Sequence, residues 1–126
     1  MEYVRRVDFE ALNANPKERS NQWLLDHTSG AESCSVNFIR TPAGGGSPAG
    51  MHTHAGDQLF YIVSGVMNID IGGKQHEAGP GSLVIFPKGM PHRNWNGGTD
   101  DTVHLAFNTP LPDPNEPLAR PVPATA

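Results

Sequence analysis

The chain has 126 residues and a single cysteine, Cys34, which excludes a disulfide within one molecule. It also lacks any apolar run of the about 18 residues that a membrane-spanning helix needs. The N-terminal stretch MEYVRRVDFE contains no apolar segment of the kind that secretion signals carry. We therefore expect a cytoplasmic protein that has no membrane partner.

Positive charge is scarce as well. The chain has 9 Lys and Arg residues against 13 Asp and Glu residues, so its net charge at pH 7 is −4. An acidic chain with a pI near 5.8 offers no basic surface to a nucleic acid. The partner that we expect is a small-molecule substrate.

Glycine and proline are abundant, with 14 and 12 residues, and they indicate many turns between short strands. Apolar and polar residues alternate over 33–40 and 102–108, as they do in strands with one buried face. Further strands are expected over 58–64, 67–71, 74–77, 82–86 and 92–96, with an edge strand over 21–27. Gly72 and Gly73 suit the tight turn of a hairpin. These patterns predict an all-β sandwich or barrel.

The remaining segments are read as connections and ends. Asp8 is expected to cap one helical turn over 9–12, and the Gly-rich stretch 41–50 is expected to be a connector. Residues 1–108 form the expected domain. Residues 109–126 are rich in proline and are predicted to be an extended arm or a disordered tail.

A candidate metal site lies in the segment GMHTHAGDQ. His52 and His54 are two residues apart, so on a strand their side chains point to the same side, and Gln58 and His92 are candidates for further ligands. The spacing alone leaves a plain alternative, because many such pairs are ordinary surface or core histidines.

The surrounding residues resemble two motifs of the cupin superfamily. Residues 50–65 are similar to the first motif, in which a His-x-His pair is followed by Glu and then Gly; Gln58 replaces that Glu, and Gly46 is the better match to the leading Gly. Residues 81–96 match every fixed position of the second motif. Those positions are Gly81, Pro87, Gly89, His92 and Asn96.

The resemblance implies an antiparallel jelly-roll barrel that holds a divalent transition metal inside. The implied ligands are His52, His54, Gln58 and His92. Nitrogen and oxygen donors suit Mn, Fe, Co, Ni, Cu or Zn and do not choose among them. The alternative is that Gln58 does not touch the metal, which leaves a site of three histidines.

Glutamine at position 58 changes the expected chemistry. Three imidazoles and an amide are neutral, so they leave the charge of a divalent ion uncancelled. The ion should then be held less tightly than with Glu, but it should be a stronger Lewis acid.

Alternation on the strands predicts which residues line the cavity. If Gln58 and His92 point inward, so do Phe60, Ile62, Asn94, Asn96 and Ala106. His104 shares this face and is our candidate proton-transferring base or substrate contact, the alternative being an exposed edge residue. His27 and His76 are expected at the surface, and Cys34 is expected as a small buried apolar group. The opposite, outward faces of two strands are apolar and suggest a homodimer.

Three functions follow from these predictions. The first is a metal-dependent enzyme that acts on a small organic molecule by Lewis-acid catalysis, as a lyase, isomerase or cyclase. It is favoured because the chain resembles small cupins with three His and one Gln, some of which have hydroxynitrile-lyase-type activity. The second is an Fe(II)-dependent dioxygenase. The third is a non-catalytic module that binds a metal and a small ligand.

Overall fold

The computed structural model describes residues 2–123. It contains a four-residue helix, α1 (Phe9–Leu12), and a 3-10 turn, η1 (His27–Ser29). Ten strands make up the rest of the regular structure. They are β1 (Ser20–Leu25), β2 (Ser35–Thr41), β3 (His52–Thr53), β4 (Asp57–Ser64), β5 (Met67–Ile71), β6 (Lys74–Ala78), β7 (Leu83–Phe86), β8 (His92–Trp95), β9 (Thr102–Thr109) and β10 (Arg120–Pro121).

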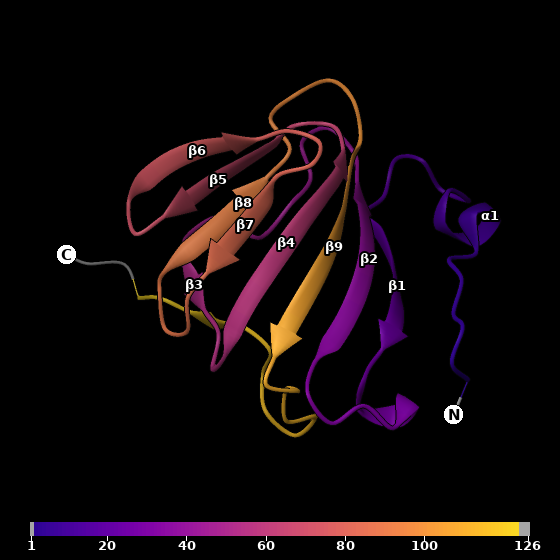
Figure 1. The fold of residues 1–126 in the computed structure, drawn as a ribbon. Coiled ribbons are helices and arrows are strands. Elements are labelled where there is room, and N and C mark those ends of the chain that lie inside the picture. Colours follow the sequence, from indigo (N-terminus) through magenta and orange to yellow (C-terminus); the bar gives the residue numbers. More distant parts are fainter. Residues whose placement is uncertain (1, 124–126) are drawn as a thin grey trace.

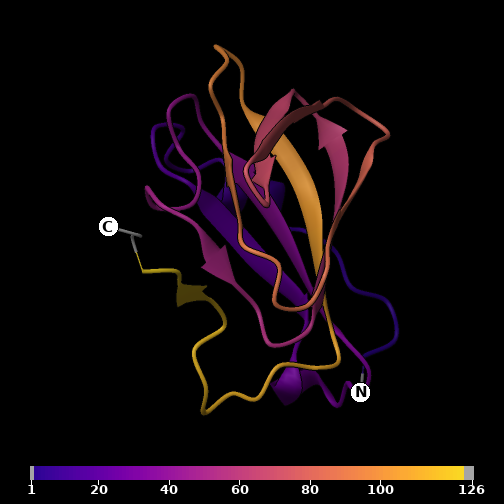
Figure 2. The ribbon, with the colours of Figure 1, turned by 90° about the vertical axis from the view of Figure 1, so that its left-hand side faces the viewer.

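The strands form two five-stranded antiparallel sheets, which confirms the predicted all-β fold. One sheet has the order β1-β2-β9-β4-β7 and the other β10-β3-β8-β5-β6 (Figure 1). Figure 2, turned by 90°, shows the two sheets as separate layers. Within the described range, no helix has the length and apolar character needed to cross a membrane.

The hydrophobic core lies between the two sheets, because each strand turns alternate side chains inward. In β9 every second residue is buried, starting from Thr102, as the sequence pattern predicts. The largest buried apolar side chains come from both sheets. They are Phe60, Ile62, Met67, Ile69 and Phe86.

Three glycines explain local features that the sequence suggested. Gly72 and Gly73 have φ angles of 60° and 93°, and they close the predicted hairpin between β5 and β6. Gly46 pairs with Trp95 as an isolated bridge, and a Cβ at position 46 would lie 2.5 Å from the Trp95 Cα. Only glycine allows the loop before β3 to pack so closely on β8.

The ends of the chain differ in how well the sequence predicted them. The Asp8 side chain accepts a hydrogen bond from the Ala11 amide and caps α1 as expected, and β1 is an edge strand. For the proline-rich segment after β9 the sequence left two alternatives open, an extended arm or a disordered tail. The segment turns back (yellow in Figure 2), and Arg120–Pro121 pairs with β3 as a short strand.

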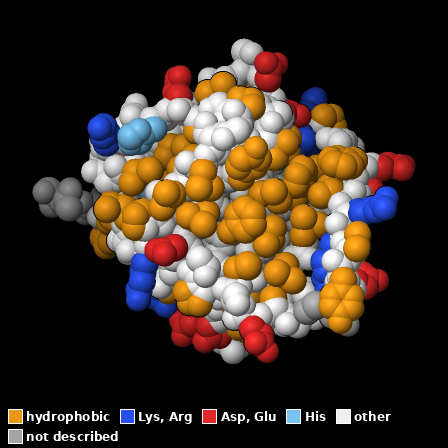
Figure 3. Space-filling model, viewed as in Figure 1, with side chains coloured by type: hydrophobic (Ala, Val, Ile, Leu, Met, Phe, Trp, Pro, Cys, Tyr) orange, Lys and Arg blue, Asp and Glu red, His pale blue; other side chains and the backbone are white. Residues whose placement is uncertain are grey.

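One sheet carries an apolar surface. Tyr61 and Val63 of β4 and Leu83 and Ile85 of β7 are 43–57% exposed, and Tyr61 lies directly opposite Leu83 in the sheet. We call these four residues the outer apolar face. Figure 3 shows hydrophobic side chains gathered across this side of the molecule.

Cys34 departs from its expected environment. It is half-buried rather than buried, and it immediately precedes β2. The buried face of β2 begins with Ser35 and continues with Asn37 and Ile39, so alternation turns Cys34 away from the core. His27 and His76 are exposed, as predicted.

Candidate metal centre

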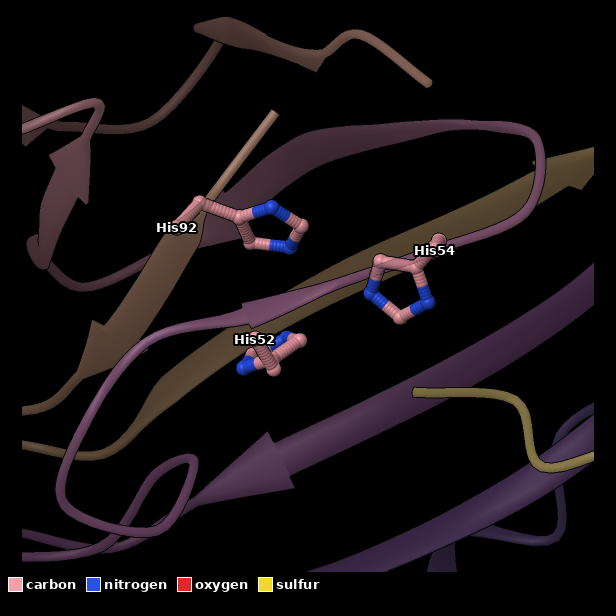
Figure 4. Close-up of side chains that lie close together, drawn as sticks. All are labelled: His52, His54 and His92. Carbon is pink, nitrogen blue, oxygen red and sulfur yellow. The ribbon is translucent and has the colours of Figure 1, made fainter. Parts of the chain in front are cut away.

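Three histidines from separate parts of the sequence meet at one point. His52 in β3 lies directly opposite His92 in β8, and His54 follows β3. Their nearest potential ligand atoms all lie within 4.8 Å of one another, and Figure 4 shows the three rings facing a common space. The structure therefore brings together the three histidines that the sequence analysis selected.

Backbone carbonyls fix the orientation of two of these rings. The Nδ1 atom of His54 lies 2.7 Å from the Leu118 carbonyl oxygen, and that of His92 lies 2.9 Å from the Met90 carbonyl oxygen. Because a carbonyl only accepts, each Nδ1 must carry a proton and donate, which leaves the lone pair on Nε2. Such a bond is the usual support of a metal-binding histidine.

The Nε2 atoms are the ones that lack partners. Those of His54 and His92 are buried, and neither has a hydrogen-bond partner in the described part of the chain. A buried polar atom without a partner is costly, and a metal ion would satisfy both lone pairs. The residues present thus fit a divalent transition metal, whose identity this donor set does not determine.

Burial keeps the imidazoles neutral. It is the main cause that lowers the pKa of His92 to about 4, with the charges of His52 and His54 acting in the same direction and the bond to Met90 opposing them. Burial likewise lowers the pKa of His52 and of His54, and the Leu118 carbonyl and the Gln58 side chain oppose the shift at His54. Near pH 7 these histidines are in the neutral form that binds metals.

Gln58 lies beside the cluster in a chain of polar side chains. Its Nε2 donates to Asn108 Oδ1 at 3.0 Å, and Asn108 Nδ2 donates to Ser35 Oγ at 3.1 Å. All three residues are buried. Since the amide nitrogen is occupied by Asn108, the Gln58 Oε1 atom is left available to a ligand. That this oxygen coordinates a metal remains a prediction.

We expect Gln58→Glu to slow the loss of metal to a chelator. A carboxylate adds a negative charge to the donor set, and Asn108 can support it by turning its amide to donate. Release is measured by competition with a chromogenic chelator, with Asn108→Asp as a matched control that places the new charge one residue further away. Equal release rates for the wild type and Gln58→Glu would show that Gln58 is not a ligand.

A cavity of about 510 Å³ opens beside the histidines, and His52 and His54 are among its lining residues. Phe60, Asn94 and Ala106 line it, as the sequence analysis expected. The other two expected residues lie elsewhere.

Ile62 is fully buried in the hydrophobic core, and Asn96 is 1% exposed. The Asn96 amide donates to the backbone carbonyls of Thr41 and Asp100, so it organises loops. Both residues share a strand face with cavity residues, but that face continues beyond the cavity into the packed interior.

His104 occupies the cavity as a buried histidine, rather than an exposed edge residue. It is 1% exposed, its ring centroid lies 4.4 Å from that of Phe60, and neither ring nitrogen has a partner within residues 2–123. Burial, with a smaller contribution from the charge of Arg19, lowers the pKa of His104 to about 3. The ring is therefore neutral near pH 7, and one of its two unpartnered nitrogens carries a lone pair.

Sequence reasoning missed two residues at this site. Leu118 supplies the carbonyl that holds His54, and no periodic pattern marks its position in the proline-rich segment. Arg19 also lines the cavity. Its alternation with Asn21 and Trp23, which continues the inward face of β1, was a usable signal.

The chain is similar to a curated protein, to solved structures and to a family model. A Streptomyces coelicolor protein, "Uncharacterized protein SCO3923", is 32% identical over 57 residues, and this match covers 45% of the present chain. The match spans 54% of that curated relative, or about half of its length.

Two solved structures share the fold. The polyketide cyclase RemF from Streptomyces resistomycificus has a TM-score of 0.70 and 25% identity, over 86% of this chain and 74% of that one. An RmlC-like cupin family protein from Methanocaldococcus jannaschii, with a double-stranded β-helix fold, has a TM-score of 0.71 and 20% identity, over 88% and 93%.

The family assignment rests on a match to a family model. The model described as "Cupin domain" matches residues 38–107, which are more than half of the chain and include all three clustered histidines. The protein therefore belongs to the cupin domain family.

Proposed function

We propose that this cupin is a metal-dependent enzyme that acts on a small organic molecule by Lewis-acid catalysis, as a lyase, isomerase or cyclase. The observation that carries the proposal is the position of His104. A buried, neutral histidine with two unpartnered nitrogens shares a cavity with a cluster of neutral histidines. That pairing suits a reaction in which one group polarises an oxygen and another moves a proton.

The site residues divide into two roles. His52, His54 and His92, together with Gln58, would hold a divalent ion, which when bound supplies positive charge that polarises a substrate oxygen. His104 would accept a proton from the substrate and return it. Phe60 packs against the His104 ring and limits its rotation.

The similarity to RemF supports the cyclase type of chemistry among the three, since that protein is a polyketide cyclase and shares a quarter of its aligned residues with this chain. A reaction of this class needs a substrate with an enolisable carbonyl or a comparable acidic C–H bond. The cavity volume of about 510 Å³ suits a small ligand of that kind.

The proposal is tested by proton exchange in the absence of oxygen. Protein loaded with Mn, Fe, Co, Ni, Cu or Zn is incubated in D₂O under nitrogen with small ketones, β-dicarbonyl compounds and hydroxynitriles. We expect metal-dependent deuterium incorporation or bond cleavage in at least one series, followed by NMR and abolished by a chelator. A parallel set of samples is kept in air, where turnover that requires and consumes oxygen would instead identify a dioxygenase. Tight ligand retention without exchange under either condition would identify a binding module.

We also propose that a second copy of the chain covers the outer apolar face. Leu83 and Ile85 are more than half exposed on edge strand β7, and they adjoin Tyr61 and Val63 in one continuous patch that contains no charge. Two such patches related by a two-fold axis would bury each other.

Light scattering at micromolar concentration should therefore give about twice the chain mass of 13.5 kDa. The double variant Leu83→Lys, Ile85→Lys should be a monomer, because it places charges on the patch. Val4→Lys changes a residue that is 76% exposed and is not part of the outer apolar face, and it should leave the mass unchanged. A monomeric wild type would contradict the proposal.

A further inference from the structure

The charge of the cavity wall is unusual for an acidic protein. Arg19 is the sole Lys or Arg side chain among the described residues that line it, and none of those residues is Asp or Glu. The chain as a whole carries more acidic than basic residues and a net charge of −4. The cavity therefore has the opposite sign to the molecule around it.

Arg19 is not used by the fold. No hydrogen bond or ion pair engages its side chain in the described part of the structure, and burial alone lowers its pKa. The residue as a whole is exposed, which places it at the rim of the cavity, where protein atoms still crowd its guanidinium. Arg19 and His104 line the same cavity, and the charge of Arg19 contributes to the lowered pKa of the His104 ring.

Arg40 makes the polar contacts that the Arg19 side chain lacks. Arg40 is buried, forms an ion pair with Asp101 at 3.2 Å, and donates from Nη2 to the carbonyls of Asn15 and Glu18 at 2.9 Å each. These bonds fix the backbone immediately before Arg19. Arg40 thus organises the segment, whereas Arg19 presents a free guanidinium to the cavity.

A planar guanidinium matches the two oxygens of a carboxylate and binds them through paired hydrogen bonds. A phosphate group usually requires more donors, such as a helix N-terminus or a nest of backbone amides. The cavity offers a single cation with the side-chain amide of Asn94 also in its lining, whereas the Ser47 hydroxyl already donates to the Asn94 backbone carbonyl. This donor set favours the carboxylate.

We propose that the substrate is a small organic carboxylate, whose anionic group binds Arg19 at the rim while its other end reaches the histidine cluster and His104. The inference rests on the proposed function for the identity of the reacting end. The preference for a carboxylate is inferred from the residues that line the cavity and does not require that function.

The test compares carboxylates with amides of the same shape. Acetate, pyruvate, levulinate and benzoate are paired with acetamide, pyruvamide, levulinamide and benzamide, and binding to metal-loaded protein is measured by ligand-observed NMR. We expect the carboxylates to bind better than their amides. Arg19→Gln should weaken the best carboxylate about tenfold or more, since hydrogen bonds between charged groups are strong, and should leave its amide unchanged.

Two further variants show whether charge or geometry matters. Arg19→Lys keeps the charge but loses the planar fork, so its affinity should lie between those of the wild type and Arg19→Gln. Arg6→Gln removes the same charge from an exposed residue that does not line the cavity, and it should bind like the wild type. Metal content is measured in every variant and should not change.

The outcomes separate this inference from the proposed function. If carboxylates bind no better than amides, or if Arg19→Gln binds them as well as the wild type, the carboxylate proposal is wrong while the metal chemistry is untouched. If the protein retains no metal but still prefers carboxylates through Arg19, the proposed function fails and the anion site stands.

Discussion

His52→Ala should lose metal while the protein stays folded. His52 is only half-buried, so its removal leaves little empty volume in the interior. It does remove one of three clustered imidazoles. Loss of a residue that merely supports a metal ligand typically costs 10–100-fold in affinity, so loss of a ligand should cost at least about a hundredfold. Elemental analysis after dialysis measures the metal, and circular dichroism checks the fold.

His92→Ala should lose metal too, but at a greater cost in stability. His92 is 1% exposed and stacks on Phe86, with a ring centroid distance of 4.1 Å. Truncating a large buried side chain to alanine commonly lowers the free energy of unfolding by about 2–5 kcal/mol. The two variants should therefore agree in metal content and differ in denaturant midpoint.

His76→Ala provides the control, because His76 is exposed on β6 and belongs to no cluster of metal-binding residues that the described structure contains. It should keep both metal and stability. Full metal occupancy in His52→Ala or in His92→Ala would refute the site.

The fold was predictable where the chain is periodic. Alternation located the buried faces of β4 and β9, because a strand places every second side chain on the same side of a sheet. On β2 the buried face begins with Ser35 and is not the face of Cys34, which was expected to be buried. Spacing on a strand paired His52 with His54, and the resemblance to the two cupin motifs implied that His92 joins them. His52 and His92, 40 residues apart, lie directly opposite each other in register.

The site was less predictable where its parts come from irregular segments. The carbonyl of Leu118 reaches His54 only because the proline-rich segment turns back along β3, and its side-chain pattern does not specify that path. Ile62 illustrates a second limit. Alternation places it on the same face as Phe60, but it does not indicate where along that face the cavity ends and the packed core begins.

His104→Gln should slow turnover by about 10²–10⁴-fold without releasing the metal, since that is the usual contribution of a positioned proton-transferring group. Glutamine keeps a polar side chain of similar length but does not titrate near neutral pH. The rate is measured with the substrate identified in the exchange screen, and metal content is measured in the same samples. An unchanged rate would remove His104 from the reaction and favour a binding role.

The pH dependence of stability tests whether the His104 ring is held neutral in the folded protein. Its pKa is lowered from 6.5 to about 3 in the folded protein, so the unfolded chain takes up the proton first as the pH falls. The stability contributed by the neutral ring is therefore present above about pH 6.5 and is lost as the pH falls towards 3. Between pH 7 and pH 4 this single group should lower the free energy of unfolding by about 3 kcal/mol.

His104→Gln should remove that part of the pH dependence, whatever its effect on stability at pH 7. Urea unfolding of chelator-treated protein at pH 7, 5.5 and 4 measures it, with His76→Gln as the matched change at an exposed histidine. The other titrating groups are common to all three proteins, so the difference between their curves isolates His104. If the His104→Gln curve runs parallel to the wild type, the ring is not held neutral in the folded state. The burial of the His104 ring would then not hold in solution, and the role of His104 in the reaction would rest on the turnover of His104→Gln alone.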